Sequence, residues 1–210
     1  MLWFALLGAF HGLNPAMGWL FAVALGLQER HAAGVLRALP PIALGHAASV
    51  AVVLAVVIAA QLAVPLAAVR VAGGVALLLF GAYRLVRRGR HPRWVGMRVG
   101  FRDLTLWSFL MSSAHGAGLM LVPVLLGGAA AAAMPEHAGA AAPASRAAGA
   151  GLAALGVHTA ALLAVMGAVA LLVYRVLGLG LLRRAWINVD LLWTITLLTA
   201  GLVTLAIGRG

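Results

Sequence analysis

Four histidines fall inside long apolar stretches of this 210-residue chain, where a polar side chain at depth marks a functional site by default. They are His11, His46, His115 and His158. An imidazole binds Ni, Co, Zn or Cu, exchanges protons near neutral pH, and forms hydrogen bonds between membrane helices. We therefore expect the four rings to share one metal or proton site near the middle of the bilayer. The alternative is that they serve only as hydrogen-bonding groups between helices.

Several neighbours in sequence have side chains that would complement such a site. We expect Asn14 to bind the ligand together with the histidines. Auxiliary roles are predicted for Met17, Ser112, Ser113, Met120 and Thr159. Methionine sulfur would favour copper, although methionines at helical spacing also serve as ordinary packing residues.

The first and fourth apolar stretches also contain residues that interrupt helices. Pro15, in "HGLNPAM", lacks a backbone N–H and clashes with the preceding turn, so the helix should break or kink there. Gly116 and Gly118 should loosen the fourth stretch at the matching depth. Because lipid cannot satisfy the freed carbonyl groups, both breaks should face protein or a wet cavity.

One acidic residue, Asp190, falls inside a proposed span. We expect it to cap the last helix at its cytoplasmic start or to pair with Arg183 or Arg184. The alternative role is that of a proton relay.

The composition is that of an integral membrane protein. Hydrophobic residues make up 64% of the chain, charged residues 9%, and the mean hydropathy is +1.08. A soluble domain has about 25% charged residues. There is no cysteine, which excludes disulfides and thiolate metal ligands. All fifteen basic residues behind the net charge of +11 are arginines, and most lie between apolar runs, so we interpret the charge as membrane topology and expect no nucleic-acid partner.

The apolar runs predict an all-α fold with six transmembrane helices, because each run reaches the length of about 20 residues needed to span a bilayer. The predicted spans are residues 2–27, 38–61, 66–86, 104–126, 150–173 and 187–208. Twelve of the fifteen arginines fall in alternate connections, which should face the cytoplasm of a bacterial-type inner membrane. Both termini are then external.

The histidine pattern divides the chain into two similar halves. His11 and His115 each precede a glycine, and "LGH" at His46 resembles "LGVH" at His158. The prediction is a single membrane domain with a first three-helix repeat at 1–88 and a cytoplasmic arginine-rich loop at 89–103. The second repeat, 104–210, includes an external alanine-rich loop at 127–149. Three spans per half give the halves opposite orientations, an architecture that places transporter sites at the midplane.

The helix plan, the Asn14-Pro15 break and the intramembrane histidines resemble the lysine-exporter superfamily, most closely its nickel/cobalt efflux branch. The resemblance extends over nearly the whole chain in architecture and over few specific residues. It implies a transporter of small solutes or metals built from inverted three-helix repeats.

We therefore expect a membrane transporter that moves a transition-metal cation through a histidine site, by exchange with protons. The alternatives are a proton-coupled carrier of a small organic solute or anion, and a non-transporting membrane metalloprotein. No nucleophile–base pair, phosphate-binding loop or zinc-protease motif is present, so we expect no enzymatic activity. The expected partners are the lipid bilayer, a small cation or solute, and a second copy of the chain.

Overall fold

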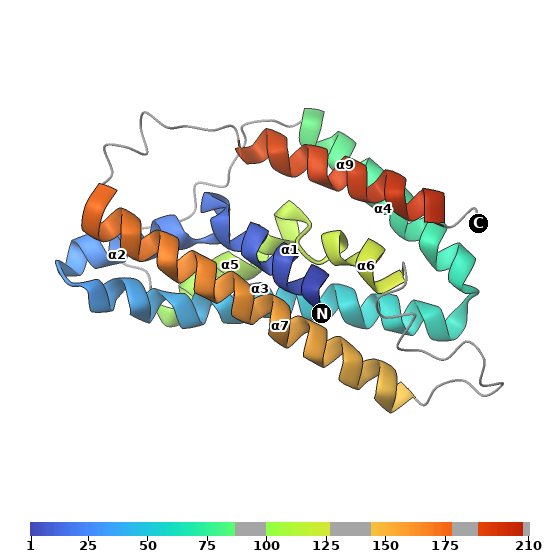
Figure 1. The fold of residues 1–210 in the computed structure, drawn as a ribbon, viewed down its shortest axis with the longest axis horizontal. Helices are drawn as coiled ribbons and strands as arrows, with labels where there is room; N and C mark the ends of the chain where they lie inside the picture. Colours follow the sequence, from blue (N-terminus) through green and yellow to red (C-terminus); the bar gives the residue numbers. More distant parts are fainter. Residues whose placement is uncertain (87–99, 127–143, 178–188, 208–210) are drawn as a thin grey trace.

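The computed structural model describes residues 1–86, 100–126, 144–177 and 189–207, and every regular element in those ranges is a helix (Figure 1). The elements are α1 (Leu2–Leu13), η1 (Pro15–Met17), α2 (Trp19–Glu29), α3 (Ala32–Ala63), α4 (Leu66–Val86), α5 (Phe101–His115), η2 (Leu119–Leu121), α6 (Val122–Leu126), α7 (Ala144–Leu172), the π-helical turn η3 (Val173–Leu177) and α9 (Val189–Ile207).

Three of the helical segments are long and apolar enough to cross a membrane. They are Ala32–Gln61, Leu66–Val86 and Gly149–Val176. Three shorter apolar helical segments accompany them: Leu2–Leu13, Trp19–Glu29 and Leu191–Ala206. The prediction of an all-helical fold is therefore confirmed for the described residues. The long apolar helices are consistent with a membrane protein, and the number of six spans stays a prediction.

The first predicted span is interrupted where the sequence places Asn14 and Pro15. Asn14 leaves the helical conformation, with φ −73° and ψ 119°, and its Oδ1 accepts a hydrogen bond from the backbone N–H of Ala16 at 2.9 Å. Gly18 has φ +123°, which L side chains rarely adopt. The indole N–H of Trp19 donates to the carbonyl of Leu13 at 3.1 Å. This carbonyl at the end of α1 therefore has a hydrogen-bond partner within the protein.

The fourth predicted span is also broken, at Gly116. This glycine ends α5 in the left-handed conformation, with φ +70°, and its N–H bonds back to the last turn. Gly118 is helical instead, with φ −66°, and lies where a side chain would collide with Val53. Gly118 therefore permits close packing, and Gly116 supplies the left-handed residue at which α5 ends.

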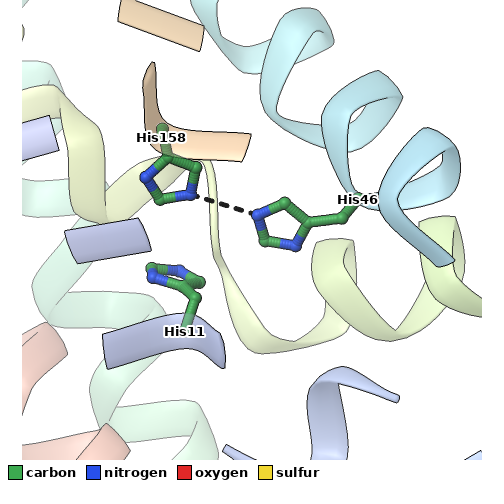
Figure 2. A group of neighbouring side chains, drawn as sticks. All are labelled: His11, His46 and His158. Atoms are coloured by element: carbon green, nitrogen blue, oxygen red, sulfur yellow. Dashed lines mark hydrogen bonds between the residues drawn. The ribbon is translucent and has the colours of Figure 1, made fainter. Parts of the chain in front are cut away.

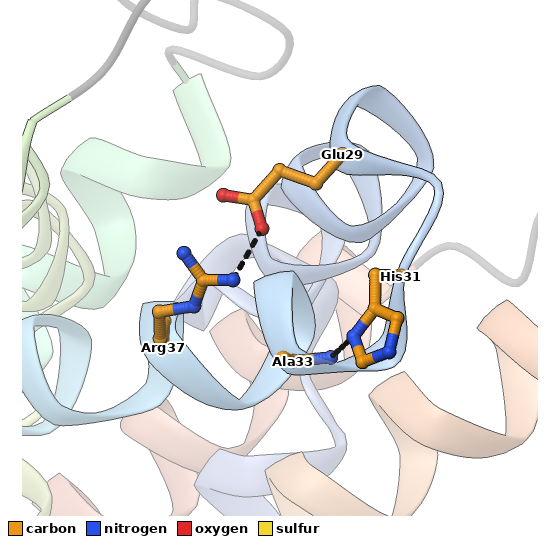
Figure 3. A network of polar contacts seen from close by, with 4 residues as sticks. All are labelled: Glu29, His31, Ala33 and Arg37. Carbon is orange, nitrogen blue, oxygen red and sulfur yellow. Dashed lines mark hydrogen bonds and ion pairs between the residues drawn. The ribbon is translucent and has the colours of Figure 1, made fainter.

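The turn between α2 and α3 is held by local polar contacts (Figure 3). Arg30 adopts a left-handed conformation with φ 53° and ends α2. His31 caps α3, because its Nδ1 accepts from the backbone N–H of Ala33 at 3.0 Å. Glu29 and Arg37 form an exposed ion pair at 3.0 Å. This loop histidine therefore has a structural role at a helix start.

Two helices begin earlier in the chain than predicted. α3 starts at Ala32, six residues before the expected boundary, and it accommodates Pro40 and Pro41 without ending. α7 starts at Ala144, so residues 144–149 of the expected external loop are helical. Alanine is the strongest helix former, which explains this extension. Residues 127–143 and 89–99 of the two expected loops lie outside the described residues.

Two pairs of helices from different halves of the chain run parallel. Along α1, Gly8 faces His158 of α7, and Gly12, one turn later, faces residues 162–166. Along α3, Gly45 packs on the backbone of α5 at residues 105–109, and Ser49, one turn later, bonds to Ser113. In both pairs the glycine is needed because a side chain would collide with the partner's backbone.

The third pair, α4 and α9, lies side by side and runs antiparallel (Figure 1). Gly74 of α4 faces Leu205 and Gly201, whereas Gly81 faces the earlier residue Leu198. An apolar core formed mainly by α2, α3, α4, α7 and α9 joins this pair to the other helices.

Candidate metal centre

Three histidines from three helices meet in the interior of the protein: His11 of α1, His46 of α3 and His158 of α7 (Figure 2). Each has an exposed fraction of 0%. One potential ligand nitrogen from each ring lies within 4.8 Å of the other two. The Nε2 atoms of His46 and His158 are 3.1 Å apart, and their rings are nearly parallel.

The opposite nitrogen of each ring is held by a hydrogen bond. His11 Nδ1 donates to the carbonyl oxygen of Leu7 at 2.6 Å, one turn earlier in α1. His158 Nδ1 donates to the carbonyl of Phe4 at 3.2 Å, across the α1–α7 contact. His46 Nδ1 bonds to the hydroxyl of Ser112 in α5 at 2.9 Å. Each ring is therefore oriented by an outer partner, as is usual for metal-binding histidines.

A carbonyl oxygen only accepts hydrogen bonds, so the protons of His11 and His158 sit on Nδ1. The Nε2 atoms of both neutral rings then carry lone pairs. His11 Nε2 is buried and makes no hydrogen bond within the described part of the chain. A buried lone pair without a partner is costly, which makes this atom an open ligand position.

The geometry suits a transition-metal ion. A tetrahedral zinc with Zn–N bonds near 2.05 Å holds its nitrogens about 3.3 Å apart. The pair formed by His46 and His158 already has that spacing at 3.1 Å. The donor set is three imidazoles, which suits Zn, Cu and Ni better than Mg or Ca. The structure thus contains a group of three histidines able to hold such an ion.

The fourth histidine of the apolar stretches, His115, lies outside this group. Its Nδ1 donates to the carbonyl of Met111 at 2.8 Å, in the same manner that His11 bonds to its own helix. Its ring packs edge to face on Trp193, with centroids 6.1 Å apart. The shared site expected for four histidines therefore has three members in the structure, because His115 lies at the end of α5 beside α9.

Trp193 of α9 was not foreseen from the sequence, although it contacts two of the four histidines. Its ring lies edge to face with the ring of His11, with centroids 4.6 Å apart, and stacks on the ring of Phe10, with centroids 5.3 Å apart. Its indole N–H donates to the carbonyl of His115 at 2.6 Å. Trp193 is fully buried and links the breaks of the first and fourth predicted spans. A tryptophan in an apolar run carries no sequence signal that separates this role from packing.

The expected helper residues divide between the site and the core. Ser112 contacts the site directly through His46. Asn14 is buried and uses its Oδ1 in the turn after α1, while its Nδ2 has no partner among the described residues. Met17 and Met120 lie in the main apolar core, so they are packing residues here.

Two of the remaining candidates, Ser113 and Thr159, form no hydrogen bond to the three histidines in the part of the chain that the structure describes. Ser113 is exposed and bonds to the hydroxyl of Ser49 at 2.9 Å. Thr159 has a buried hydroxyl without a partner in the described ranges. Asp190 falls in α9, but its side chain lies outside the described residues, as do the possible partners Arg183 and Arg184.

Comparison with known protein families, characterised proteins and solved structures finds no match for this chain. We therefore infer the function from the chemistry of the site and from the arrangement of the helices.

Proposed function

We propose that the protein is a membrane transporter that carries a transition-metal cation through the site formed by His11, His46 and His158. The observation that carries this proposal is the convergence of three fully buried imidazoles from three helices, with their ligand atoms within 4.8 Å. Polar groups buried among apolar membrane helices are costly and are retained where they serve function.

The pairing of the helices supports an inverted repeat. If the first and second halves are exchanged, the contact of α1 with α7 becomes the contact of α5 with α3, and α4 exchanges with α9. The two exchanged contacts are both parallel, and the α4–α9 pair is antiparallel, as opposite orientation of the halves requires. This is the arrangement that the resemblance to the lysine-exporter superfamily implies, and we propose that the chain is related to it.

Corresponding contacts around the histidines support the same interpretation. His11 and His115 each bond to the carbonyl four residues earlier, and a 3₁₀ turn begins four residues after each of them. His46 and His158 each bond to the broken helix of the opposite half. In such architectures the substrate binds where the halves meet, and one half moves against the other.

Three neutral imidazoles favour a cargo that binds and leaves. The group consists of three histidines and contains no carboxylate to neutralise a divalent cation. A proton bound to one of these rings therefore repels the metal ion and also occupies a ligand nitrogen. A ligand nitrogen must be unprotonated to bind. We therefore propose that protons exchange for the metal at these rings.

A second function has its own support. The contact between His46 and His158 Nε2 atoms already holds one proton between two rings. The same pair would serve a proton-coupled carrier of a small organic solute or anion. A metalloprotein that does not transport is the third candidate, since a buried three-histidine site also suits a resident ion.

Metal binding and proteoliposome uptake together separate these functions. The full-length protein is titrated with Zn²⁺ or Ni²⁺ and then assayed for uptake of the same ion under an imposed pH gradient. We expect one ion per chain and uptake that is lost in H158A, while H31A, which alters a helix cap, retains both. Absence of metal binding would overturn the proposal. Binding without uptake would identify a resident metal instead.

A further inference from the structure

The three histidines of the site differ in what holds their outer nitrogen. Backbone carbonyls, which only accept hydrogen bonds, hold His11 and His158. A hydroxyl, which can donate or accept, holds His46 at 2.9 Å. His46 and Ser112 are both buried, with exposed fractions of 0% and 1%. This difference decides which of the three rings can move its proton without losing a hydrogen bond.

The hydrogen bonds determine the tautomers of the three rings in this arrangement. His158 has its proton on Nδ1, because it donates to the carbonyl of Phe4. Its Nε2 is therefore an acceptor, so His46 Nε2 must donate across the 3.1 Å contact. The neutral His46 ring then has a bare Nδ1, and Ser112 must donate its hydroxyl proton to that nitrogen.

A metal requires the other tautomer of His46. All three imidazoles would bind the ion through unprotonated Nε2 atoms, which His11 and His158 already present. His46 instead carries its proton on that atom while it donates to His158. The proton must move to Nδ1, and the hydroxyl of Ser112 must then turn from donor to acceptor.

We propose that Ser112 is a positioning residue that lets His46 change tautomer when a metal enters the site. The inference rests on the proposed metal function. In the empty protein, Ser112 donates to Nδ1 and stabilises the Nε2–H form that bonds to His158. In the loaded protein, Ser112 accepts from Nδ1–H and stabilises the form whose Nε2 binds the ion. Either state satisfies every polar atom of His46.

The neighbouring serines of α5 make different contacts. Ser108, one turn earlier, donates to the carbonyl of Ile42 at 2.6 Å, a contact that cannot reverse. Ser113 bonds to Ser49 and not to an imidazole. Ser108 is equally buried and equally polar, so it is a matched control on the same helix.

Nitrogen-15 NMR of the full-length protein, labelled at histidine, tests the proposal directly. The ring nitrogens of His46, identified by the signals missing from H46Q, report which nitrogen carries the proton. We expect protonated Nε2 without metal and protonated Nδ1 after one equivalent of Zn²⁺. The same tautomer before and after Zn²⁺ binding would overturn the switch while leaving the metal site intact. If Zn²⁺ does not bind to the wild type, the metal function fails and the switch fails with it.

Zn²⁺ affinity of variants gives a second test. We expect S112A to bind Zn²⁺ about 10–100-fold more weakly, the usual cost of losing an outer-shell partner of a ligand. S112T keeps a hydroxyl and should restore both the affinity and the tautomer change. S108A should bind as the wild type does. Equal affinity of S112A and wild type, or equal losses in S112A and S108A, would contradict the special role of Ser112.

Discussion

His46 and His158 meet through their Nε2 atoms at 3.1 Å, although 112 positions separate them in the chain. His46 lies in the first half of the chain, and its Nδ1 bonds to Ser112 of the second half. His158 lies in the second half, and its Nδ1 bonds to the carbonyl of Phe4 in the first half. The contact therefore exists only when the two halves are assembled. A change in how the halves pack would alter the spacing of the ligand atoms.

Substitution of single histidines should separate the three-membered group from the fourth ring. We expect H11A, H46A and H158A each to weaken Zn²⁺ binding by more than the about 10–100-fold that loss of an outer-shell partner costs. H115A should retain binding of one ion, because His115 lies outside the group. Isothermal titration of the purified variants measures this. An equal loss in H115A would show that all four rings bind the ion.

Trp193 should report metal binding through its fluorescence. Its ring lies 4.6 Å from the ring of His11, so a paramagnetic ion such as Cu²⁺ at the site should quench its emission. Diamagnetic Zn²⁺ should quench it much less. The chain has six tryptophans, and W193F removes the contribution of Trp193 while the other five remain. Equal Cu²⁺ quenching in W193F and the wild type would place the ion elsewhere.

The glycines between the parallel helices should tolerate no side chain. A Cβ at Gly8 or Gly45 would collide with backbone atoms of the partner helix. Overpacking of this kind costs about 1–3 kcal/mol, so we expect G8A and G45A to lower the midpoint of thermal unfolding in detergent.

Gly156 provides the control, because a Cβ there meets nothing within 4 Å and the residue lies in α7 close to His158. Alanine in a helix interior is favoured over glycine by about 0.5–1 kcal/mol, so G156A should unfold at an unchanged or higher temperature. Destabilisation of G156A as large as that of G8A would attribute the effect to helix α7 and not to the interface.

The natural absence of cysteine allows single thiols to test the topology. Gln28 and Val64 are exposed and flank the ends of α3, which at 32 residues and 1.5 Å per residue is about 48 Å long. From the arginine distribution, we expect an impermeant thiol reagent to label V64C from outside and Q28C only after cell lysis. Labelling in the reverse order would invert the orientation, and labelling of both from one side would show that α3 does not cross.

The breaks in the helices could be predicted because their causes are local. Proline lacks a backbone N–H, and a glycine tolerates the left-handed conformation, so the chain leaves the helix at Asn14-Pro15 and at Gly116 in the places expected. The start of α3 is predicted six residues too late, at residue 38, because the apolar run begins only after Arg37 whereas the helix itself begins at Ala32.

The sequence by itself determined that the chain is helical and apolar, that its helices break near two histidines, and that four histidines fall within apolar stretches. Only the tertiary structure decided that His11, His46 and His158 form one group, while His115 packs on Trp193. Helical periodicity follows from the local chain, whereas the distance between rings depends on how closely helices approach at glycines such as Gly8 and Gly45. The packing of the helices also decides which groups bond to the ring nitrogens. Two of these groups are the backbone carbonyls of Leu7 and Phe4, which every residue type possesses and which the sequence therefore cannot indicate.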